Sequence, residues 1–265
     1  MPQTLSESWR FIDSGAHSAY YNMATDLALL KNVHQPVLRF YSWKPWAISL
    51  GHHQDLSEIN ETKCARDKID IVRRPTGGKA ILHAEELTYC VVFPAQHPLQ
   101  QESINAVYQH ISEALLLGLK IYGANNIERT ESKGAHKLYA DSAACFSSSV
   151  NFEITTSNRK LIGSAQRRFK EGILQHGSLL TGPAHENLEH YLTSQQKNDH
   201  LLQNKAACLE DVLGFKPEMA KLKSALKSGF EKYFFIAFTN CELTAKEQLQ
   251  AEKFTKTFQY GEVTQ

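Results

Sequence analysis

The segment Arg73–His83 reads RRPTGGKAILH and leads into the apolar run Leu87–Phe93. It contains a turn between two strand-like stretches, an arrangement that recurs along the chain. Two arginines precede a turn fixed by proline, and the paired glycines allow close backbone approach and present bare N–H groups. Arg74 and Lys79 could add positive charge for a phosphate or a carbonyl group. The same pattern is typical of a tight hairpin with solvated cations, so the segment alone leaves both interpretations open.

Further apolar, aromatic and β-branched runs lie on either side of this segment, and glycine or proline separates several of them. Such runs predict strands joined by turns. The predicted strands are Val37–Trp43, Trp46–Leu50, Ile69–Arg73, Leu87–Phe93, Val150–Thr155, Lys160–Gly163 and Ile173–Leu180.

Helical spacing of apolar residues predicts helices in much of the remaining chain. These cover Tyr20–Lys31, Ile104–Leu119, Leu209–Leu213 and Pro217–Phe230. Thr244-x-x-Glu247 is a capping-box pattern before a last helix, and the polar stretch Gly123–Ser142 predicts a loop. Without regular βαβ alternation, the mixture predicts an α+β fold. We expect one domain over residues 1–265, with an α/β core in 1–183 and a helical C-terminal extension in 184–265.

Composition excludes several classes of protein. The 265 residues are 42% hydrophobic and carry 29 Lys+Arg against 28 Asp+Glu. This is too apolar for a disordered chain, and a net charge of +1 argues against nucleic-acid or membrane-surface binding.

The five cysteines are scattered without a C-x-x-C pair, which favours free thiols over disulfides or zinc. With no apolar leader and no long apolar run, we expect a cytoplasmic protein.

Two familiar motifs fail on inspection. Gly77–Lys79 resembles the end of a phosphate-binding P-loop, but Arg73 occupies the position of the earlier glycine and Ala80 replaces the required Ser or Thr. His185 and His190 are five residues apart, so they do not share a helix face as zinc-binding histidines would. We therefore expect no metal site.

A second unusual segment combines a lysine with small residues. Asn158–Arg168 reads NRKLIGSAQRR, and Ile173–Leu180 reads ILQHGSLL. Lys160 opens a strand that ends in Gly163–Ala165, where a ligand chain could lie against the backbone. The alternatives are a solvated strand lysine and, for His176, a partly buried histidine with satisfied hydrogen bonds.

Cys145 lies among small residues in DSAACFSSS, Asp141–Ser149. Free cysteines are often inert and buried, and a thiol with a pKa of about 8.5 is only a few per cent thiolate near pH 7. A nearby ammonium such as that of Lys160 would raise the thiolate fraction. Composition alone leaves both an inert and a nucleophilic Cys145 open.

Taken together and in order, RRPTGG with His83, KLIGSAQRR and QHGSLL resemble the lipoate–protein ligase and octanoyltransferase family, relatives of biotin–protein ligases. NMATD at Asn22–Asp26 and SLGHHQ at Ser49–Gln54 also match, and the resemblance covers roughly residues 9–181. It implies a catalytic domain of mixed or antiparallel sheets flanked by helices.

Details of the sequence are most similar to the cysteine-dependent octanoyltransferases of this family. Many ligases have a third glycine where this chain has Lys79, and Ala144-Cys145-Phe146 matches the [AP]-C-F segment of those transferases. Phe152–Ile154 follows at the expected distance. Octanoyltransferases of the shorter type instead carry a cysteine soon after the residue that corresponds to His176, and none follows closely here.

The resemblance implies transfer of an octanoyl group from octanoyl–acyl carrier protein to a lysine of a lipoyl domain, on an H protein or an E2 subunit. Cys145 would form the thioester, and Lys160 would hold the acyl carbonyl and lower the pKa of the thiol. No cofactor is expected. The substrate-binding residues implied are Arg74, Thr76, Gly77, Gly78, His83, Gly163, Ser164, Ala165, His176 and Gly177. The cations expected to meet the acidic carrier protein are Arg73, Arg74, Lys79 and Arg167.

Three alternatives stay open at this point. An ATP-dependent lipoate–protein ligase would form lipoyl-adenylate with Mg²⁺, and Cys145 would be incidental. An amidotransferase would move the acyl group between two lipoyl domains. A non-catalytic subunit would only bind a lipoyl domain, although such a protein would not need Lys160.

Overall fold

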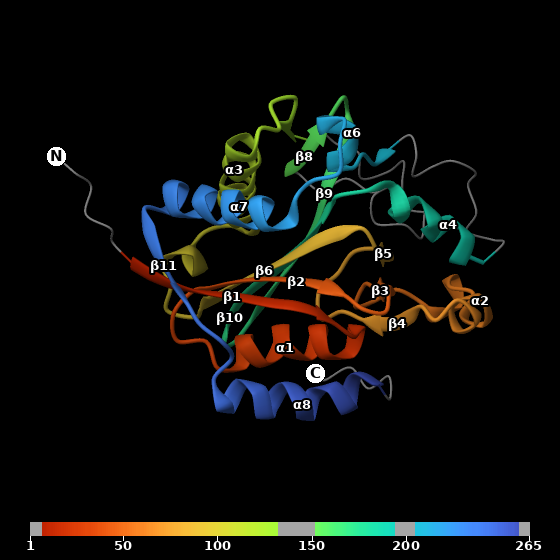
Figure 1. Cartoon of the computed structure of the whole chain (residues 1–265). Helices are drawn as coiled ribbons and strands as arrows, with labels where there is room; N and C mark the ends of the chain where they lie inside the picture. The colour runs from red at the N-terminus through yellow and green to blue at the C-terminus, as the bar shows by residue number, and fades with distance from the viewer. Residues whose placement is uncertain (1–6, 132–151, 194–204, 260–265) are drawn as a thin grey trace.

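The computed structural model describes residues 7–131, 152–193 and 205–259, and a mixed eight-stranded sheet forms its centre (Figure 1). The first strand pairs in parallel with its neighbours on both sides, whereas all other neighbouring strands of this sheet are antiparallel. In spatial order the strands are β11 (Ile236–Asn240), β1 (Glu7–His17), β2 (Val37–Trp43), β6 (Glu86–Pro94), β10 (Gly172–Leu180), β9 (Arg159–Phe169), β8 (Phe152–Thr156) and β7 (Glu128–Glu131).

Two pairs of helices cover the two faces of this sheet (Figure 1). Helices α3 (Ile104–Tyr122) and α7 (Met219–Phe234) pack on one face, and α1 (Ala19–Lys31) and α8 (Ala245–Gln259) on the other. All nine residues of β6 are buried, because alternate side chains enter the two cores. The sandwich therefore leaves the central strands without a solvated face, so every polar group on them needs a partner inside the protein.

A smaller three-stranded sheet lies beside the large one, in the order β4 (Asp70–Arg73), β3 (Ala47–Leu50) and β5 (Ile81–His83). Its apolar residues form a third core with Leu180 and with the segments around Leu188 and Cys208. The short helices are η1 (Leu56–Glu58), α2 (Glu61–Arg66), η2 (Pro98–Gln101), η5 (Pro183–Asn187), α4 (Leu188–Tyr191) and α6 (Leu209–Leu213). In the described ranges, no helix combines the length and apolar character needed to cross a bilayer.

The α+β prediction, with mixed sheets flanked by helices, is confirmed, and most predicted elements are present within a few residues. The predicted capping box also forms, since the N–H of Thr244 donates to Glu247 and the N–H of Glu247 to Thr244 Oγ1. Four strands were not predicted: β1, β5, β7 and β11. Strands β1, β7 and β11 lie at or near an edge of the large sheet, and their half-exposed or polar residues give a weak alternating pattern. Strand β5 has only three residues, too few for a pattern.

Strand β11 lies within the segment predicted to be helical throughout, and it extends the main sheet next to β1. The predicted loop Gly123–Ser142 likewise contains β7, while its residues from 132 onward lie outside the described part of the chain.

Helices α3 and α7 cross closely at Gly118 and Gly229. A Cβ built on Gly229 would lie 2.4 Å from both the carbonyl oxygen of Ala114 and the N–H nitrogen of Gly118. We expect Gly229→Ala to lower the free energy of unfolding by about 1–3 kcal/mol, because the backbones must separate. Alanine's better helix propensity offsets part of this effect. Ser224→Ala, at an exposed position of α7, is the control and should be near neutral in urea unfolding; equal values for both variants would contradict the prediction.

Candidate active site

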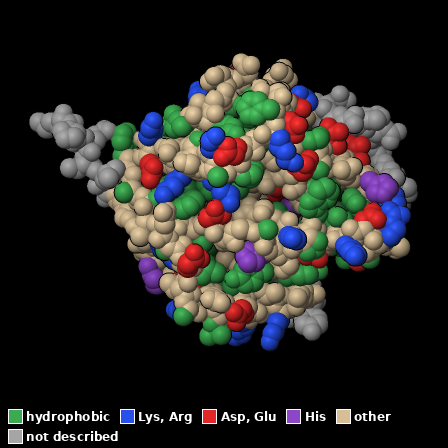
Figure 2. Space-filling view, in the orientation of Figure 1, with side chains coloured by type: hydrophobic (Ala, Val, Ile, Leu, Met, Phe, Trp, Pro, Cys, Tyr) green, Lys and Arg blue, Asp and Glu red, His purple; other side chains and the backbone are tan. Residues whose placement is uncertain are grey.

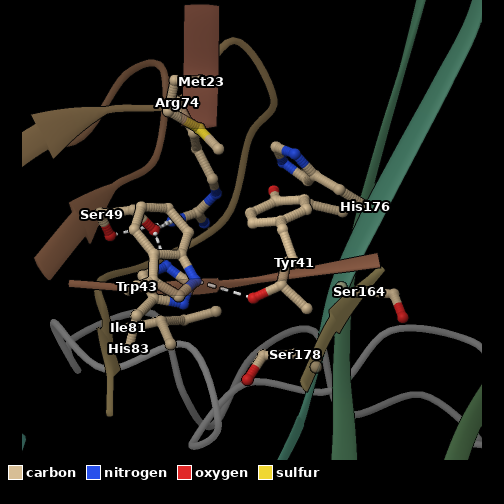
Figure 3. A pocket seen from close by; sticks show the side chains of 14 residues that line it. Met23, Tyr41, Trp43, Ser49, Arg74, Ile81, His83, Ser164, His176 and Ser178 are labelled. Atoms are coloured by element: carbon tan, nitrogen blue, oxygen red, sulfur yellow. Dashed lines mark hydrogen bonds between the residues drawn. The ribbon is translucent and has the colours of Figure 1, made fainter. Parts of the chain in front are cut away.

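A pocket opens where the small sheet meets the large one (Figure 3). Its walls come from α1, from β2, β6, β9 and β10 of the large sheet, and from the small sheet with its connecting loop. The residues that line it are Met23, Tyr41, Trp43, Ser49, Arg74, Ile81, His83, Thr88, Gly163, Ser164, Ala165, His176, Gly177 and Ser178.

The structure brings together most of the predicted substrate-binding residues at this pocket. Those on its walls are Arg74, His83, Gly163, Ser164, Ala165, His176 and Gly177. Thr76 lies just behind the wall, with Oγ1 2.7 Å from Nε2 of His176. Gly77 and Gly78 belong to the same loop but do not line the pocket. The loop packs so closely on the neighbouring turn that a Cβ on Gly51 would lie 1.8 Å from the carbonyl oxygen of Gly78.

The two predicted catalytic residues have different outcomes. Lys160 is 4% exposed and lies on β9, three residues before Gly163, although it is not among the pocket's lining residues. Its carbonyl oxygen accepts a hydrogen bond from the N–H of Ala207. Cys145 lies outside the residues that the structure describes, so its role stays a prediction.

The other cysteines are poor candidates for a nucleophile. Burial raises the pKa of Cys64 and of Cys208 to about 11 and that of Cys90 well above its ordinary value, so these thiols stay protonated near neutrality. Cys241 is half-buried and accepts a hydrogen bond from Nε of Arg10, at the opposite edge of the sheet from β9. Among the described cysteines, none lines the pocket.

Arg74 holds the glycine loop in place. Its Nε donates to the carbonyl oxygen of Gly77, Nη1 to the backbone and hydroxyl oxygens of Ser49, and Nη2 to the carbonyl oxygens of Gly77 and Lys79. Arg73 similarly donates to three carbonyl oxygens in residues 51–54, and Arg167 to that of Pro75. These cations therefore shape the pocket through the backbone.

One buried carboxylate, Asp26 of α1, organises the side of the pocket near β2 and β10. Its Oδ1 accepts a 2.7 Å ion-pair hydrogen bond from Arg39, and Oδ2 accepts from Tyr41 at 2.9 Å and from Nδ1 of His176 at 3.1 Å. Burial raises the pKa of Asp26, but the hydrogen bond from His176 and the positive charge of Arg39 outweigh it, so the pKa lies below its ordinary value. Burial lowers the pKa of His176, which favours a neutral ring with Nδ1 donating and Nε2 accepting from Thr76.

A second buried carboxylate, Glu86 of β6, organises the opposite side. Oε1 accepts from Nδ1 of His83 at 2.8 Å and from Trp43 at 3.1 Å, and the hydroxyls of Thr88 and Ser178 also donate to Glu86. Burial raises the pKa of Glu86, yet the attraction of His83 and the four hydrogen bonds hold it below its ordinary value. The ring of Trp43 stacks on His83 with centroids 3.9 Å apart (Figure 3).

Sequence reasoning did not identify Asp26, Glu86, Ser49, Tyr41 and Trp43 as functional residues. Asp26 lies in the matching segment Asn22–Asp26 and within a predicted helix, and Glu86 directly precedes the apolar run Leu87–Phe93. That context was the available signal. Among the described residues, no group of His, Cys, Asp and Glu is arranged to hold a metal ion.

A model of the lipoyl protein ligase A/B catalytic domain matches residues 18–231. The chain belongs to this family. The expected family membership is thus confirmed, and the matched range includes every lining residue of the pocket.

Relatives within the family narrow the activity. Octanoyltransferase LipM of Halalkalibacterium halodurans is 36% identical over 269 residues, covering 94% of this chain and 95% of that protein. Octanoyltransferase LipM of Carboxydothermus hydrogenoformans is 38% identical over 263 residues, covering 94% and 96%. These relatives confirm the prediction of an acyltransferase.

The fold is also that of a bi-partite lipoate protein ligase from Thermoplasma acidophilum, which was studied with its E2 lipoyl domain. The TM-score is 0.78 with 19% identity, and the match covers 98% of each chain.

Asp26→Asn tests the buried ion pair. The change leaves Arg39 as an uncompensated charge without exposed surface, so we expect the free energy of unfolding to fall by about 3–5 kcal/mol in urea. Asp67→Asn, which breaks a largely exposed pair with Arg66, is the control and should cost less than about 1 kcal/mol. A small effect at Asp26 would show that the pair is not needed for stability.

The lowered pKa values also predict acid sensitivity. His176 takes up a proton more readily in the unfolded chain, so its contribution to stability is present above about pH 6.5 and is lost as the pH falls. Asp26 and Glu86, with lowered pKa values, lose their contributions only below about pH 4. We expect urea midpoints to fall from pH 7.5 to pH 5 and more steeply in stronger acid, with a shallower first phase in His176→Gln. Greater stability at pH 5 would contradict this.

Proposed function

We propose that the protein is an octanoyltransferase that takes its acyl group from octanoyl–acyl carrier protein and delivers it to a lysine of a lipoyl domain, on an H protein or an E2 subunit. The observation that carries the proposal is the pocket, in which three separately predicted segments meet in a chain that aligns with octanoyltransferases over nearly its full length. The reaction needs no ATP or metal. The scattered free thiols suit a reducing compartment, and we place the reaction in the cytoplasm.

The first half-reaction forms an acyl-enzyme. The Cys145 thiolate attacks the carbonyl carbon of the donor thioester, the bond to the carrier sulfur breaks, and the carrier leaves as its thiol. Because one thioester replaces another, the step is nearly thermoneutral. In the second half-reaction the lysine amine attacks the Cys145 thioester, and formation of the more stable amide drives the transfer.

The side chains that line the pocket suit an acyl group. Met23, Trp43 and Ile81 provide apolar contacts, and each buried methylene of the chain contributes about 0.8 kcal/mol. The small residues Gly163 and Ala165 let an acyl chain approach the strand backbone. We assign to Lys160 the role of holding the acyl carbonyl and stabilising the Cys145 thiolate.

The main alternative is an ATP-dependent ligase, and the fold shared with the Thermoplasma ligase is the observation that favours it. Such an enzyme would activate free lipoate or octanoate with ATP and Mg²⁺. An amidotransferase would use a lipoyl domain as donor in place of the carrier protein.

Incubation with octanoyl–acyl carrier protein in the absence of ATP tests the proposal. We expect intact-mass analysis to show one octanoyl adduct, and peptide mapping to place it on Cys145. Cys145→Ala should abolish both the adduct and the octanoylation of a lipoyl domain, because the nucleophile is gone. Cys241→Ala, a change at a half-buried thiol away from the pocket, is the control and should behave as wild type.

Acceptor modification that requires ATP and free acid would instead establish a ligase. Modification only from an octanoylated lipoyl domain would establish an amidotransferase, and no modification from any donor would favour a binding subunit.

A further inference from the structure

Two carboxylate–histidine–hydroxyl chains meet at the pocket. In Asp26–His176–Thr76 and in Glu86–His83–Ser49, the carboxylate bonds Nδ1 of the histidine, and Nε2 lies 2.7 Å from a hydroxyl oxygen. The chains differ in where they end. Neither Thr76 nor Ser49 has solvent-exposed surface, but Thr76 does not line the pocket, whereas Ser49 and His83 both form part of its wall (Figure 3). Only the second chain therefore leads from a buried carboxylate to the hydroxyl of a residue in the pocket wall.

The directions of the hydrogen bonds in this second chain can be assigned. The ionised Glu86 can only accept, so Nδ1 of His83 donates to it and Nε2 is left with a lone pair. Nη1 of Arg74 donates to Ser49 Oγ at 3.1 Å, and the Ser49 hydroxyl can then donate its proton to Nε2 of His83. A group that donates a proton to Ser49 Oγ can thereby protonate His83, because the original hydroxyl proton of Ser49 moves on to Nε2.

The surroundings hold His83 rigidly for such a role. Trp43 stacks on one face of the ring with an interplanar angle of 13°. Glu86 is fully buried and receives hydrogen bonds from Trp43, Thr88 and Ser178, which fixes its orientation. The titratable or charged groups facing this pair are Glu86 itself, Arg74, His176 and His185. Glu86 is thus the nearest negative charge available to stabilise a protonated His83.

The proposed function creates a need for a base. An acceptor lysine with a pKa of about 10.4 arrives as an ammonium, and roughly one molecule in 2,500 is neutral near pH 7. Only the neutral amine can attack a thioester, so a proton must be removed in the second half-reaction. The first half-reaction, in which a thiolate attacks, involves no lysine proton.

We propose that His83, reached through Ser49 and oriented by Glu86, accepts the proton of the acceptor lysine in the second half-reaction. This inference rests on the proposed octanoyltransferase function. His83 and Ser49 contact the reacting amine or its proton, and Glu86 is a positioning residue.

The step balances. The lysine ammonium gives one proton to Ser49 Oγ, and the Ser49 hydroxyl proton passes to Nε2 of His83, leaving a neutral amine and an imidazolium beside Glu86. The amine forms a C–N bond with the acyl carbon, and the C–S bond breaks. The second nitrogen proton leaves with the thiolate, which becomes a thiol, and His83 returns its proton to solvent.

Glu86→Gln and Ser49→Ala test the role by measuring the two half-reactions separately. We expect both variants to acquire the octanoyl adduct at the wild-type rate. Transfer to a lipoyl domain near pH 7 should fall by about 10²- to 10⁴-fold, the usual contribution of a general base. The defect should shrink as the pH approaches 10, because the lysine then loses its proton without help.

Hydroxylamine separates a missing base from a distorted site. It is largely neutral near pH 7, so it should cleave the octanoyl-enzyme to the hydroxamate equally fast in wild type and in both variants. Glu247→Gln, at another buried glutamate paired with Arg10 away from the pocket, is the matched control and should transfer at the wild-type rate. Circular dichroism establishes the folded fraction of each variant, and Ser49→Ala carries the test if Glu86→Gln does not fold.

The inference is overturned by wild-type transfer in the folded variants, by an equal loss in acylation and transfer, or by an equal loss with hydroxylamine, since the last two indicate a structural role. If wild-type protein itself acquires no octanoyl group without ATP, the proposed function fails and the inference fails with it. Failure of the proposed function is distinguishable from failure of this inference, because it is seen in the wild-type protein and needs no variant.

Discussion

Asp26 is a carboxylate without exposed surface, and the arrangement of the pocket depends on keeping it ionised there. Arg39 and Tyr41 of β2 and His176 of β10 supply its donors, and His176 continues to Thr76 in the glycine loop. A buried charge without partners costs far more than a lost surface contact. Helix α1, two central strands and the loop must therefore reach their positions together, and the geometry of the pocket follows from satisfying one charge.

The same rule governs the opposite side of the pocket, with a different outcome. Glu86 collects four donors and so fixes His83, but the chain continues to Ser49 in the pocket wall and does not end behind the wall. Asp26 fixes the positions of His176 and Thr76. Glu86 fixes the position of His83, which in our proposal can still exchange a proton through Ser49. The distinction lies in which hydroxyl faces the cavity, and it would be invisible from the residue types alone.

Local patterns in the sequence were sufficient for the central elements. Strands β2, β6 and β10 are apolar and continuous because they are buried on both faces, and the prediction of their positions holds to within a residue. The edge strands β1, β7 and β11 lack this signal.

The site was likewise predicted only in part. Its loop and strand segments could be identified, but the partners of Asp26 lie 13 and 150 positions away, at Arg39 and His176. Only the fold brings such residues together.

The contacts of Arg74 also bear on whether the acyl group comes from a thioester or is activated with ATP. Arg74 makes hydrogen bonds from Nε, Nη1 and Nη2 to protein oxygen atoms, and the carbonyl group of Gly77 points toward it. In a trans peptide the C=O and N–H groups point in opposite directions, so the N–H of Gly78 is turned away from the guanidinium.

Lys and Arg on the face in Figure 2 are interspersed with Asp and Glu, with no broad area of positive charge. A triphosphate needs cations with donors to spare, whereas a thioester carbonyl is neutral and needs only a fixed N–H donor. An arginine that uses its donors to position backbone groups suits the carbonyl, and this favours acyl transfer over ATP-dependent activation.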